Sequence, residues 1–398
     1  MPAVSAPRPR ALGAGLLLVL AFLAATGPFT TDLYLPSFPE IARDLGTSAS
    51  GVQLTLTAFL IGMAAGQLAF GPISDRYGRF RPLMLGSAVF VLASVVCALA
   101  PNLEILIGAR FVQGLFAAAG PVIARAVASD LTSGAAAART FSLLMTIGGV
   151  APVLAPALGG VLTGLWGWRG VLWTLAGISA LMFVCAAAVV RETLPVEKRT
   201  PGPAFKGLGL VVRRRRFLGY VLLFASSFGV LMGYISASPF IYQSLMGLSP
   251  QVYGLLFGLN AAGMVSAGFI AARLTRRVPA RRMVVRAVTV LIGVSFSMLV
   301  MVLSGVPPLL LAIPLFCLVC SMGFIMGNTT ALALAEAAGA TGSGSAVLGG
   351  AQFLMGAVVS PLTGLGGEYS ALPLALVLLG SALSAGTAVL LTRDQRPA

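Results

Sequence analysis

The chain has 398 residues, of which 58% are hydrophobic and only 9% are charged, and its formal net charge is +15. Soluble domains carry about 25% charged residues, so this composition and a mean hydropathy of +0.97 exclude an ordinary soluble enzyme or binding domain. The sequence contains no histidine, which excludes His-based catalysis and His metal sites, and we expect no metal site.

Apolar runs along the chain predict an all-α membrane protein with 12 transmembrane helices in two six-helix pseudo-repeats, because about 20 helical residues cross a bilayer. The first half, residues 1–190, holds expected spans at 11–36, 49–72, 83–100, 104–128, 139–164 and 170–191. The second half, residues 217–398, holds expected spans at 217–243, 250–272, 283–304, 309–333, 345–366 and 373–392. A polar cytoplasmic linker, residues 191–216, joins the two halves.

The basic residues predict the orientation. Of the 26 Lys and Arg residues, all except Arg43, Arg110 and Arg169 fall in the tails, the linker and one set of alternate helix ends. The positive-inside rule therefore places both termini in the cytoplasm and the chain in the inner or plasma membrane. The same distribution makes the lipid bilayer, and not a nucleic acid, the expected partner.

Two opposite charges are expected at one depth in the first half. Asp32 lies near the end of the first span and Arg110 lies near the start of the fourth. A charge inside the bilayer is expensive and so indicates function. We expect the two side chains to share a cavity, with Asp32 binding a proton or the substrate. Alternatively, Asp32 lies in a turn outside the membrane, before Pro36 and Pro39.

Residues 71–82, between the second and third spans, are interpreted as a charged turn. Its two glycines permit a tight reversal, and Asp130, at the end of the fourth span, is within reach of Arg76 or Arg79. The candidate cytoplasmic gate therefore consists of Gly71, Asp75, Arg76, Gly78, Arg79 and Asp130. When the cytoplasmic side closes, Asp75 is expected to face the start of the eleventh span. Alternatively, the turn only orients the chain.

The fifth span is rich in glycine and proline. Its candidate seam residues are Gly148, Pro152, Pro156, Gly159 and Gly160. A four-residue recurrence gives one helix face, and small residues let helices approach closely. The pattern predicts a seam that slides during transport, although static packing would use the same residues.

The second half repeats part of the first at an offset of 197 residues, with Ala272 in the place of Asp75. Such repeats are typical of secondary transporters with a site between their halves. Four polar residues are expected either to contact a substrate or to bond between helices: Ser238, Asn260, Asn328 and Gln352. Cys317 and Cys320 lie in an apolar run, where we expect them to pack.

Several motifs resemble those of the major facilitator superfamily. Residues 71–82 resemble its signature between spans two and three, apart from the extra Phe80, and Arg110-x-x-Gln113-Gly114 resembles its span-four motif. Residues 151–160 resemble the span-five motif of its antiporters. Residues 31–36 with Phe38-Pro39 resemble the span-one motif of drug:proton antiporters, and Ser238-Pro239-Phe240 points to the bicyclomycin/chloramphenicol-resistance (Bcr/CflA) branch.

This resemblance implies a monomeric exporter of a small lipophilic drug, driven by protons through alternating access, with no other cofactor. Asp32, Arg110, Gln113 and Tyr34 would handle proton and substrate. If Arg110 balances Asp32, a neutral phenicol-like or bicyclomycin-like antibiotic is the expected substrate. Two alternatives stay open, a proton-coupled metabolite symporter of the same fold and a non-transporting membrane receptor or scaffold. A membrane-embedded enzyme is disfavoured, because the sequence has no histidine and no paired carboxylates within the expected spans.

Overall fold

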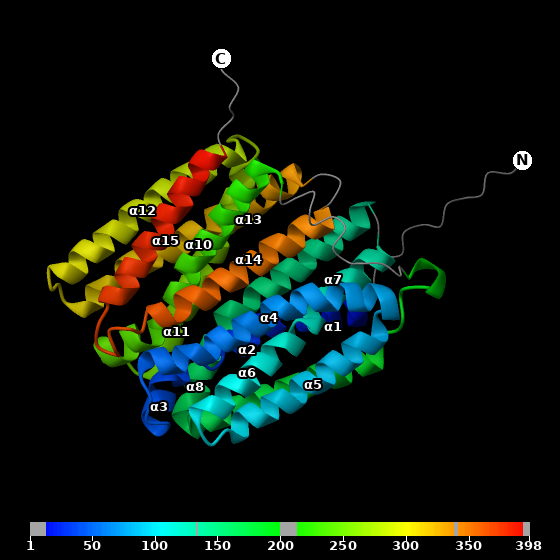
Figure 1. The fold of residues 1–398 in the computed structure, drawn as a ribbon, viewed down its shortest axis with the longest axis horizontal. Coiled ribbons are helices and arrows are strands. Elements are labelled where there is room, and N and C mark those ends of the chain that lie inside the picture. The colour runs from blue at the N-terminus through cyan, green and yellow to red at the C-terminus, as the bar shows by residue number, and fades with distance from the viewer. Residues whose placement is uncertain (1–12, 133, 200–212, 338–340, 393–398) are drawn as a thin grey trace, which may run out of the picture.

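The computed structural model describes residues 13–132, 134–199, 213–337 and 341–392, and every regular element within them is a helix (Figure 1). In the first half of the chain these are α1 (Ala14–Ala24), α2 (Thr26–Asp32), η1 (Leu35–Ser37), α3 (Phe38–Asp44), α4 (Ala49–Tyr77), α5 (Phe80–Leu99), α6 (Leu103–Ala117), α7 (Ala119–Leu131), α8 (Gly134–Val189) and η2 (Val196–Lys198). In the second half they are α10 (Arg215–Pro239), η3 (Phe240–Leu245), α11 (Pro250–Leu274), α12 (Ala280–Leu303), η4 (Pro308–Leu311), α13 (Ala312–Glu336), α14 (Thr341–Leu362) and α15 (Leu372–Leu391).

The described helices account for twelve membrane spans. Ten segments are long and apolar enough to cross a bilayer, and α1 with the helices that follow it to Asp44 forms a bent eleventh. The twelfth lies within α8, whose 56 residues are interrupted at Gly167 by a φ of 64°. Since a span needs about 20 residues, α8 is long enough for two. The predicted all-α fold with 12 transmembrane helices is confirmed.

The first span is bent and longer than expected. Its two parts meet at 41° around Ala25, three residues before Pro28. A proline ring lacks an N–H and clashes with the carbonyl four residues earlier, which kinks a helix. The span then continues past residue 36 as η1 and α3, and the Trp168 indole donates a 2.8 Å hydrogen bond to Asp44 at its end. Asp32 is therefore inside the helical bundle and not in a terminal turn.

The charged turn after the second span is shorter than expected. Helix α4 continues through Gly71 and Pro72 to Tyr77, and α5 begins at Phe80. Only residues 78–79 reverse the chain, with φ of 88° at Gly78. The interpretation of Gly71 as a turn residue was wrong, because Gly71 lies within α4. The helix accommodates Pro72 in its last two turns and ends only at Tyr77.

Helices α1 to α8 pack mainly on one another, as do α10 to α15, so the described helices form two bundles. The bundles meet along two seams, α4 against α14 and α8 against α11 (Figure 1). A cavity lies in the middle of the molecule, between these two seams.

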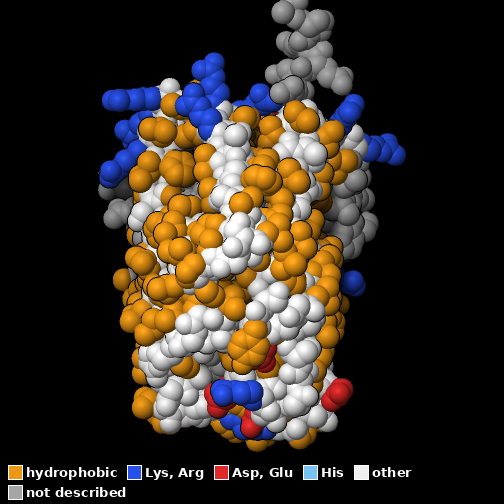
Figure 2. All heavy atoms as spheres, turned by 90° about the vertical axis from the view of Figure 1, so that its left-hand side faces the viewer, with side chains coloured by type: hydrophobic (Ala, Val, Ile, Leu, Met, Phe, Trp, Pro, Cys, Tyr) orange, Lys and Arg blue, Asp and Glu red, His pale blue; other side chains and the backbone are white. Residues whose placement is uncertain are grey.

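The two ends of the molecule differ in charge. Lys and Arg side chains gather at one end of the face shown in Figure 2, and the few Asp and Glu side chains visible on that face lie toward the other. We call the first the arginine-rich end; it carries residues 78–79, 191–199 and 275–279. The described hydrogen bonds between the bundles all lie nearer the opposite end, for example from Ser50 Oγ to the Pro361 carbonyl at 2.9 Å and from Gln243 Nε2 to the Pro36 carbonyl at 2.9 Å. The bundles are thus bonded together away from the arginine-rich end.

Candidate functional site

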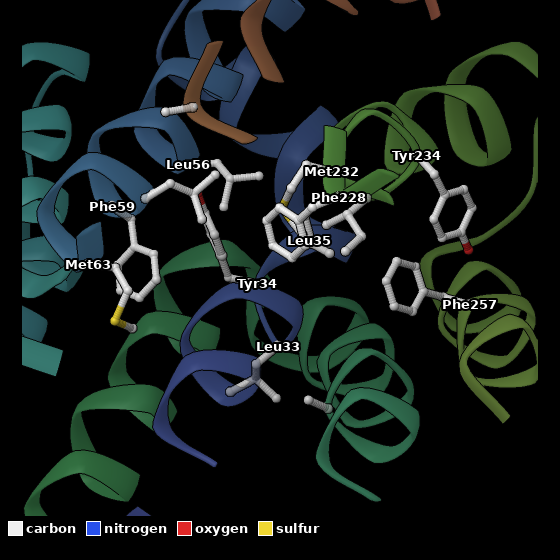
Figure 3. Packing of buried hydrophobic residues seen from close by; sticks show 14 of the residues in the cluster. Leu33, Tyr34, Leu35, Leu56, Phe59, Met63, Phe228, Met232, Tyr234 and Phe257 are labelled. Carbon is white, nitrogen blue, oxygen red and sulfur yellow. The ribbon is translucent and has the colours of Figure 1, made fainter. Parts of the chain in front are cut away.

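A cavity of about 250 Å³ lies between the two bundles. Aromatic side chains from several helices line it: Phe59 of α4, Phe228 and Tyr234 of α10, Phe257 of α11 and Phe353 of α14. Figure 3 shows four of these rings, all except Phe353, and the Tyr234 and Phe257 rings stack with their centroids 5.4 Å apart. The cavity can therefore bind a lipophilic molecule by burying its apolar surface.

Asp32 is the one charged side chain among the described residues that line this cavity. Only 5% of the surface of Asp32 is exposed. Its carboxylate accepts a 2.7 Å hydrogen bond from Thr31 Oγ1, and no cation pairs with it among the described residues. A carboxylate in such surroundings gains by binding a proton or a positively charged ligand, since either one removes an uncompensated buried charge.

Arg110 of α6 is fully buried and contacts the other side of the first span. Both of its terminal nitrogens donate to the Thr30 carbonyl at 3.2 Å, and Nη1 donates to Gln113 Oε1 at 2.6 Å. Its guanidinium lies over the rings of Tyr34 and Phe59, 4.3 and 4.6 Å from their centroids. Carbonyl, amide and aromatic faces together compensate the buried cation, as cation–π contacts do in desolvated sites.

The expectation that Asp32 and Arg110 share a cavity was wrong, although the two do lie at one depth. Thr30 and Tyr34 are four residues apart and occupy one face of the first span, and Arg110 contacts that face. Asp32 lies two residues from each, about 200° around a helix. The carboxylate therefore faces the cavity while Arg110 lies behind the span.

Gln113 and Tyr34 extend the contacts of Arg110 to the neighbouring helices. Gln113 Nε2 donates a 2.8 Å hydrogen bond to Ser94 Oγ of α5, and the Tyr34 hydroxyl lies 2.6 Å from Thr55 Oγ1 of α4. These bonds join the first four spans around Arg110 and hold the turn of helix that carries Asp32. Sequence reasoning missed Ser94 and Thr55, because serine and threonine in apolar helices give no distinctive signal.

The glycines and prolines of the fifth span lie along two neighbours. A Cβ on Gly159 would lie 1.9 Å from the Leu33 carbonyl, and one on Gly160 would lie 2.3 Å from the Pro250 carbonyl of α11. A Cβ on Gly254 of α11 would lie 2.4 Å from the Pro156 carbonyl, and Pro152 lines the cavity. Gly148 lies outside the residues whose packing is described. The seam residues thus bring α8 against the first span and against the second bundle.

The four polar residues of the second half do not line the described part of the cavity, and of the two alternatives expected for them the bonds between helices are found for Asn260 and Ser238. Asn260 donates to the hydroxyls of Tyr234 and Tyr242 at 2.7 and 3.3 Å, and Ser238 Oγ lies 3.0 Å from the Tyr253 hydroxyl. Asn328 donates to a carbonyl of its own helix, and Gln352 lies next to Phe353, which does line the cavity. Buried polar groups need partners, and for Asn260 and Ser238 neighbouring elements supply them.

At the arginine-rich end, Arg79 is the centre of an ion-pair network. Its guanidinium pairs with Asp75 at 2.5 Å and with Asp130 at 2.9 Å, and Ser74 Oγ accepts from it at 2.9 Å. Burial would lower the pKa of Arg79, but the bonds and charges of Asp130 and Asp75 outweigh burial and raise it. The network ties the turn to the end of α7.

Glu192, which sequence reasoning missed, belongs to the same network. It accepts hydrogen bonds from the backbone amides of Arg79 at 2.8 Å and Phe80 at 3.3 Å. A Cβ on Gly78 would lie 2.2 Å from its carboxylate, so a larger residue there would displace Glu192, and the positive φ of Gly78 favours glycine in any case. The only available signal was an acid directly after the sixth span.

Two of the expected gate residues stay outside this network. Arg76 lies over the ring of Tyr77 at 5.4 Å and does not contact Asp130, and Gly71 has no close neighbour. Asp75 contacts Arg79, and the described contacts do not join it to α14. With the bundles bonded together at the other end, no hydrogen bond or ion pair among the described residues joins α14 to the turn here.

The comparison with protein families agrees with the fold and the motifs. The model of the Major Facilitator Superfamily matches residues 17–360. The chain belongs to the major facilitator superfamily. It is therefore a transporter and not an enzyme, and it is a multi-pass membrane protein.

Three relatives with known sequences resemble the chain over more than half of its length. The chain is 39% identical to the "Uncharacterized MFS-type transporter YdgK" of Bacillus subtilis, over 92% of each chain. It is 30% identical to the "Bicyclomycin resistance protein homolog" of Haemophilus influenzae, over 87% of this chain and 88% of the other. It is 31% identical to the "Multidrug resistance protein MdtL" of Klebsiella pneumoniae, over 61% and 62%.

Among solved structures, the crystal structure of a D-xylose-proton symporter superposes with a TM-score of 0.74, covering 93% of this chain and 96% of that one. The two sequences are 15% identical, so this likeness shows the fold alone.

Proposed function

We propose that this major facilitator superfamily transporter exports a small lipophilic drug in exchange for protons, and that it belongs to the Bcr/CflA branch. The observation that carries the proposal is Asp32, a buried carboxyl on the wall of an otherwise apolar, aromatic cavity. The names of two relatives, a bicyclomycin resistance protein homolog and a multidrug resistance protein, support a drug as the cargo.

The arginine-rich end is assigned to the cytoplasm by the positive-inside rule. Both termini and the linker, residues 191–216, would then be cytoplasmic, with residues 1–190 and 217–398 as the two moving halves. The hydrogen bonds between the bundles lie on the far side, so the described state would be closed to the outside and receive drug from the cell. Export requires the halves to part on that side and close at the arginine-rich end.

Asp32 would exchange its occupant during the cycle. The carboxylate is stable in the cavity when a proton or a ligand compensates its charge, so a proton arriving from outside displaces the drug and a drug arriving from inside displaces the proton. Arg110, Gln113 and Tyr34 act as positioning residues, because they hold the Thr30 carbonyl and the helix face behind Asp32. A proton moving inward releases about 2.3 kcal/mol per 100 mV of membrane potential.

The expected neutrality of the drug rested on Arg110 balancing Asp32 within the cavity. Arg110 lies behind the span, so that premise is removed. A carboxylate among aromatic rings suits a lipophilic cation, through the ion pair and the cation–π contacts together. We therefore extend the proposed cargo from neutral phenicol-like or bicyclomycin-like drugs to lipophilic drugs that carry one positive charge.

The cavity also distinguishes the alternatives. A symporter for a polar metabolite needs several polar groups on the cavity wall, and the described wall offers Asp32, Thr31 and Tyr234 against fifteen other, mainly apolar residues. A receptor or scaffold needs no uncompensated charge between two bundles. Drug export accounts for both the apolar wall and the buried carboxyl.

The test is drug accumulation in inverted vesicles with an imposed pH gradient, using one neutral phenicol and one lipophilic cation. The wild-type chain should accumulate at least one of them, and Asp32→Asn should abolish accumulation at equal expression. The control is Asp44→Asn, which removes an acid at the end of α3 and should leave transport intact. Uphill transport that persists in Asp32→Asn would refute the role of this carboxyl.

A further inference from the structure

The second bundle contains another cavity, and we propose that it binds an anionic phospholipid of the leaflet at the arginine-rich end. The crevice has a volume of about 280 Å³ and lies among α11, α12 and α13, well away from Asp32. Helices α11 and α12 both pack along α13, so α13 forms the floor of the crevice and the other two form its walls. This proposal is independent of the cargo proposed above.

The crevice is apolar apart from one end. Its walls include Leu274 and Val278 from the α11 side and Met283 and Val290 of α12, and Phe324 of α13 lies on its floor. Leu274 and Val290 are 39% and 53% exposed. An exposed apolar residue within a membrane span faces lipid, so the crevice opens toward the acyl chains of the bilayer.

Arginines surround the polar end of the crevice. Arg286 lines it directly, six residues and about 9 Å along α12 from Ala280. Five more basic residues lie on the same turn and its helix ends: Arg273, Arg276, Arg277, Arg281 and Arg282. The ion pairs among the described residues involve none of these six, and the Arg281 Nε is buried without a hydrogen-bond partner. Figure 2 shows basic side chains gathered at this end of the molecule.

This arrangement matches the two parts of an anionic phospholipid. Basic pockets between transmembrane helices on the cytoplasmic side suit anionic headgroups, and the apolar crevice below suits one acyl chain. Orientation of the chain in the membrane explains an excess of arginine at this end. It does not require a crevice, nor an arginine about two turns inside a span, and a lipid accounts for both.

The experiment is native mass spectrometry of the full chain, purified in mild detergent and exposed to phosphatidylglycerol or phosphatidylcholine with identical acyl chains. We expect preferential retention of the anionic phosphatidylglycerol. Arg286→Gln should weaken retention about fivefold, the fold-change that corresponds to about 1 kcal/mol for one basic residue near an anionic headgroup. Val290→Trp should also weaken it, by filling the crevice without changing its charge.

Each variant has a matched control. Arg81→Gln removes an exposed arginine at the same end, in the first bundle, and Val300→Trp places the same ring on α12 beyond the crevice; both should retain lipid as the wild type does. Equal retention of the two lipids, or an equal loss in Arg81→Gln, would overturn the proposal. Displacement of the lipid by glycerophosphoglycerol, the headgroup without chains, would also overturn it and reveal a phosphate site instead.

Discussion

The turns after α4 and after α11 occupy equivalent places in the two bundles and are built from similar residues, yet they form different contacts. In the first turn, Arg79 is buried and paired with Asp75 and Asp130, while Glu192 binds the backbone beside it. In the second turn, the equivalent Arg276 has Ala272 four residues before it, and Glu336, at the end of α13, pairs with Arg216.

The difference shows that basic residues alone do not make a gate. Arginines at a helix end orient a span wherever they occur, but they hold helices together only where acids from other segments reach them. Among the residues that the structure describes, only the first turn has such acids, from α7 and from the segment after α8. The second turn keeps its positive charge available to the lipid surface.

Replacing the two equivalent arginines one at a time should give the largest difference in stability between the turns. Arg79→Ala leaves Asp75 and Asp130 without their common partner, although the backbone amide that binds Glu192 remains. Breaking a buried ion pair costs about 3 kcal/mol. Arg276→Ala removes a side chain without an ion pair and should change stability by less than about 0.5 kcal/mol. Thermal unfolding of the two purified variants measures the difference, and equal melting temperatures would contradict the contrast between the turns.

The next effect is a pH dependence confined to the first turn. Burial would raise the pKa of Glu192, but the backbone amides of Arg79, Leu194 and Phe80 and the charge of Arg199 outweigh burial and lower it from the ordinary 4.5. A group whose pKa is lower in the folded state stabilises the protein above its unfolded pKa, and that contribution is lost as the pH falls through the folded value.

Glu192→Gln should therefore reduce the stability of the fold at neutral pH. Below pH 4.5, the stability of this variant should fall less steeply with pH than that of the wild type. The measurement is the melting temperature across a pH series, with Glu197→Gln as the control because that side chain is exposed. A decline in Glu192→Gln as steep as in the wild type would assign the pH dependence to other acids.

An acid introduced into the second turn should make it resemble the first, with a smaller change in stability than Arg79→Ala or Glu192→Gln. Ala272→Asp places an acid two residues before the end of α11, as Asp75 is placed in α4, with Arg276 four residues later. The new pair should stabilise the protein by about 0.3–0.5 kcal/mol, and it should lower the retention of phosphatidylglycerol. Ala272→Asn is the neutral control. Unchanged lipid retention in Ala272→Asp would show that Arg276 does not contribute to the lipid site.

The number of spans, their approximate limits and the end at which positive charge gathers all followed from local sequence. Hydropathy and span length are properties of local segments, because a helix that crosses lipid must satisfy its own backbone and present apolar side chains. The shared depth of Asp32 and Arg110 also followed from the sequence, since helical rise is nearly constant.

The directions in which these side chains face, and the groups that they contact, became known from the packing of the helices. Arg110 binds the carbonyl of Thr30 behind the first span, Asn260 binds two tyrosines, and Glu192 joins a turn more than a hundred residues away. Periodicity gives the position of a residue along and around its own helix, but the rotation of that helix against its neighbours depends on how all the helices pack. That rotation leaves Asp32 as the charged group facing the cavity.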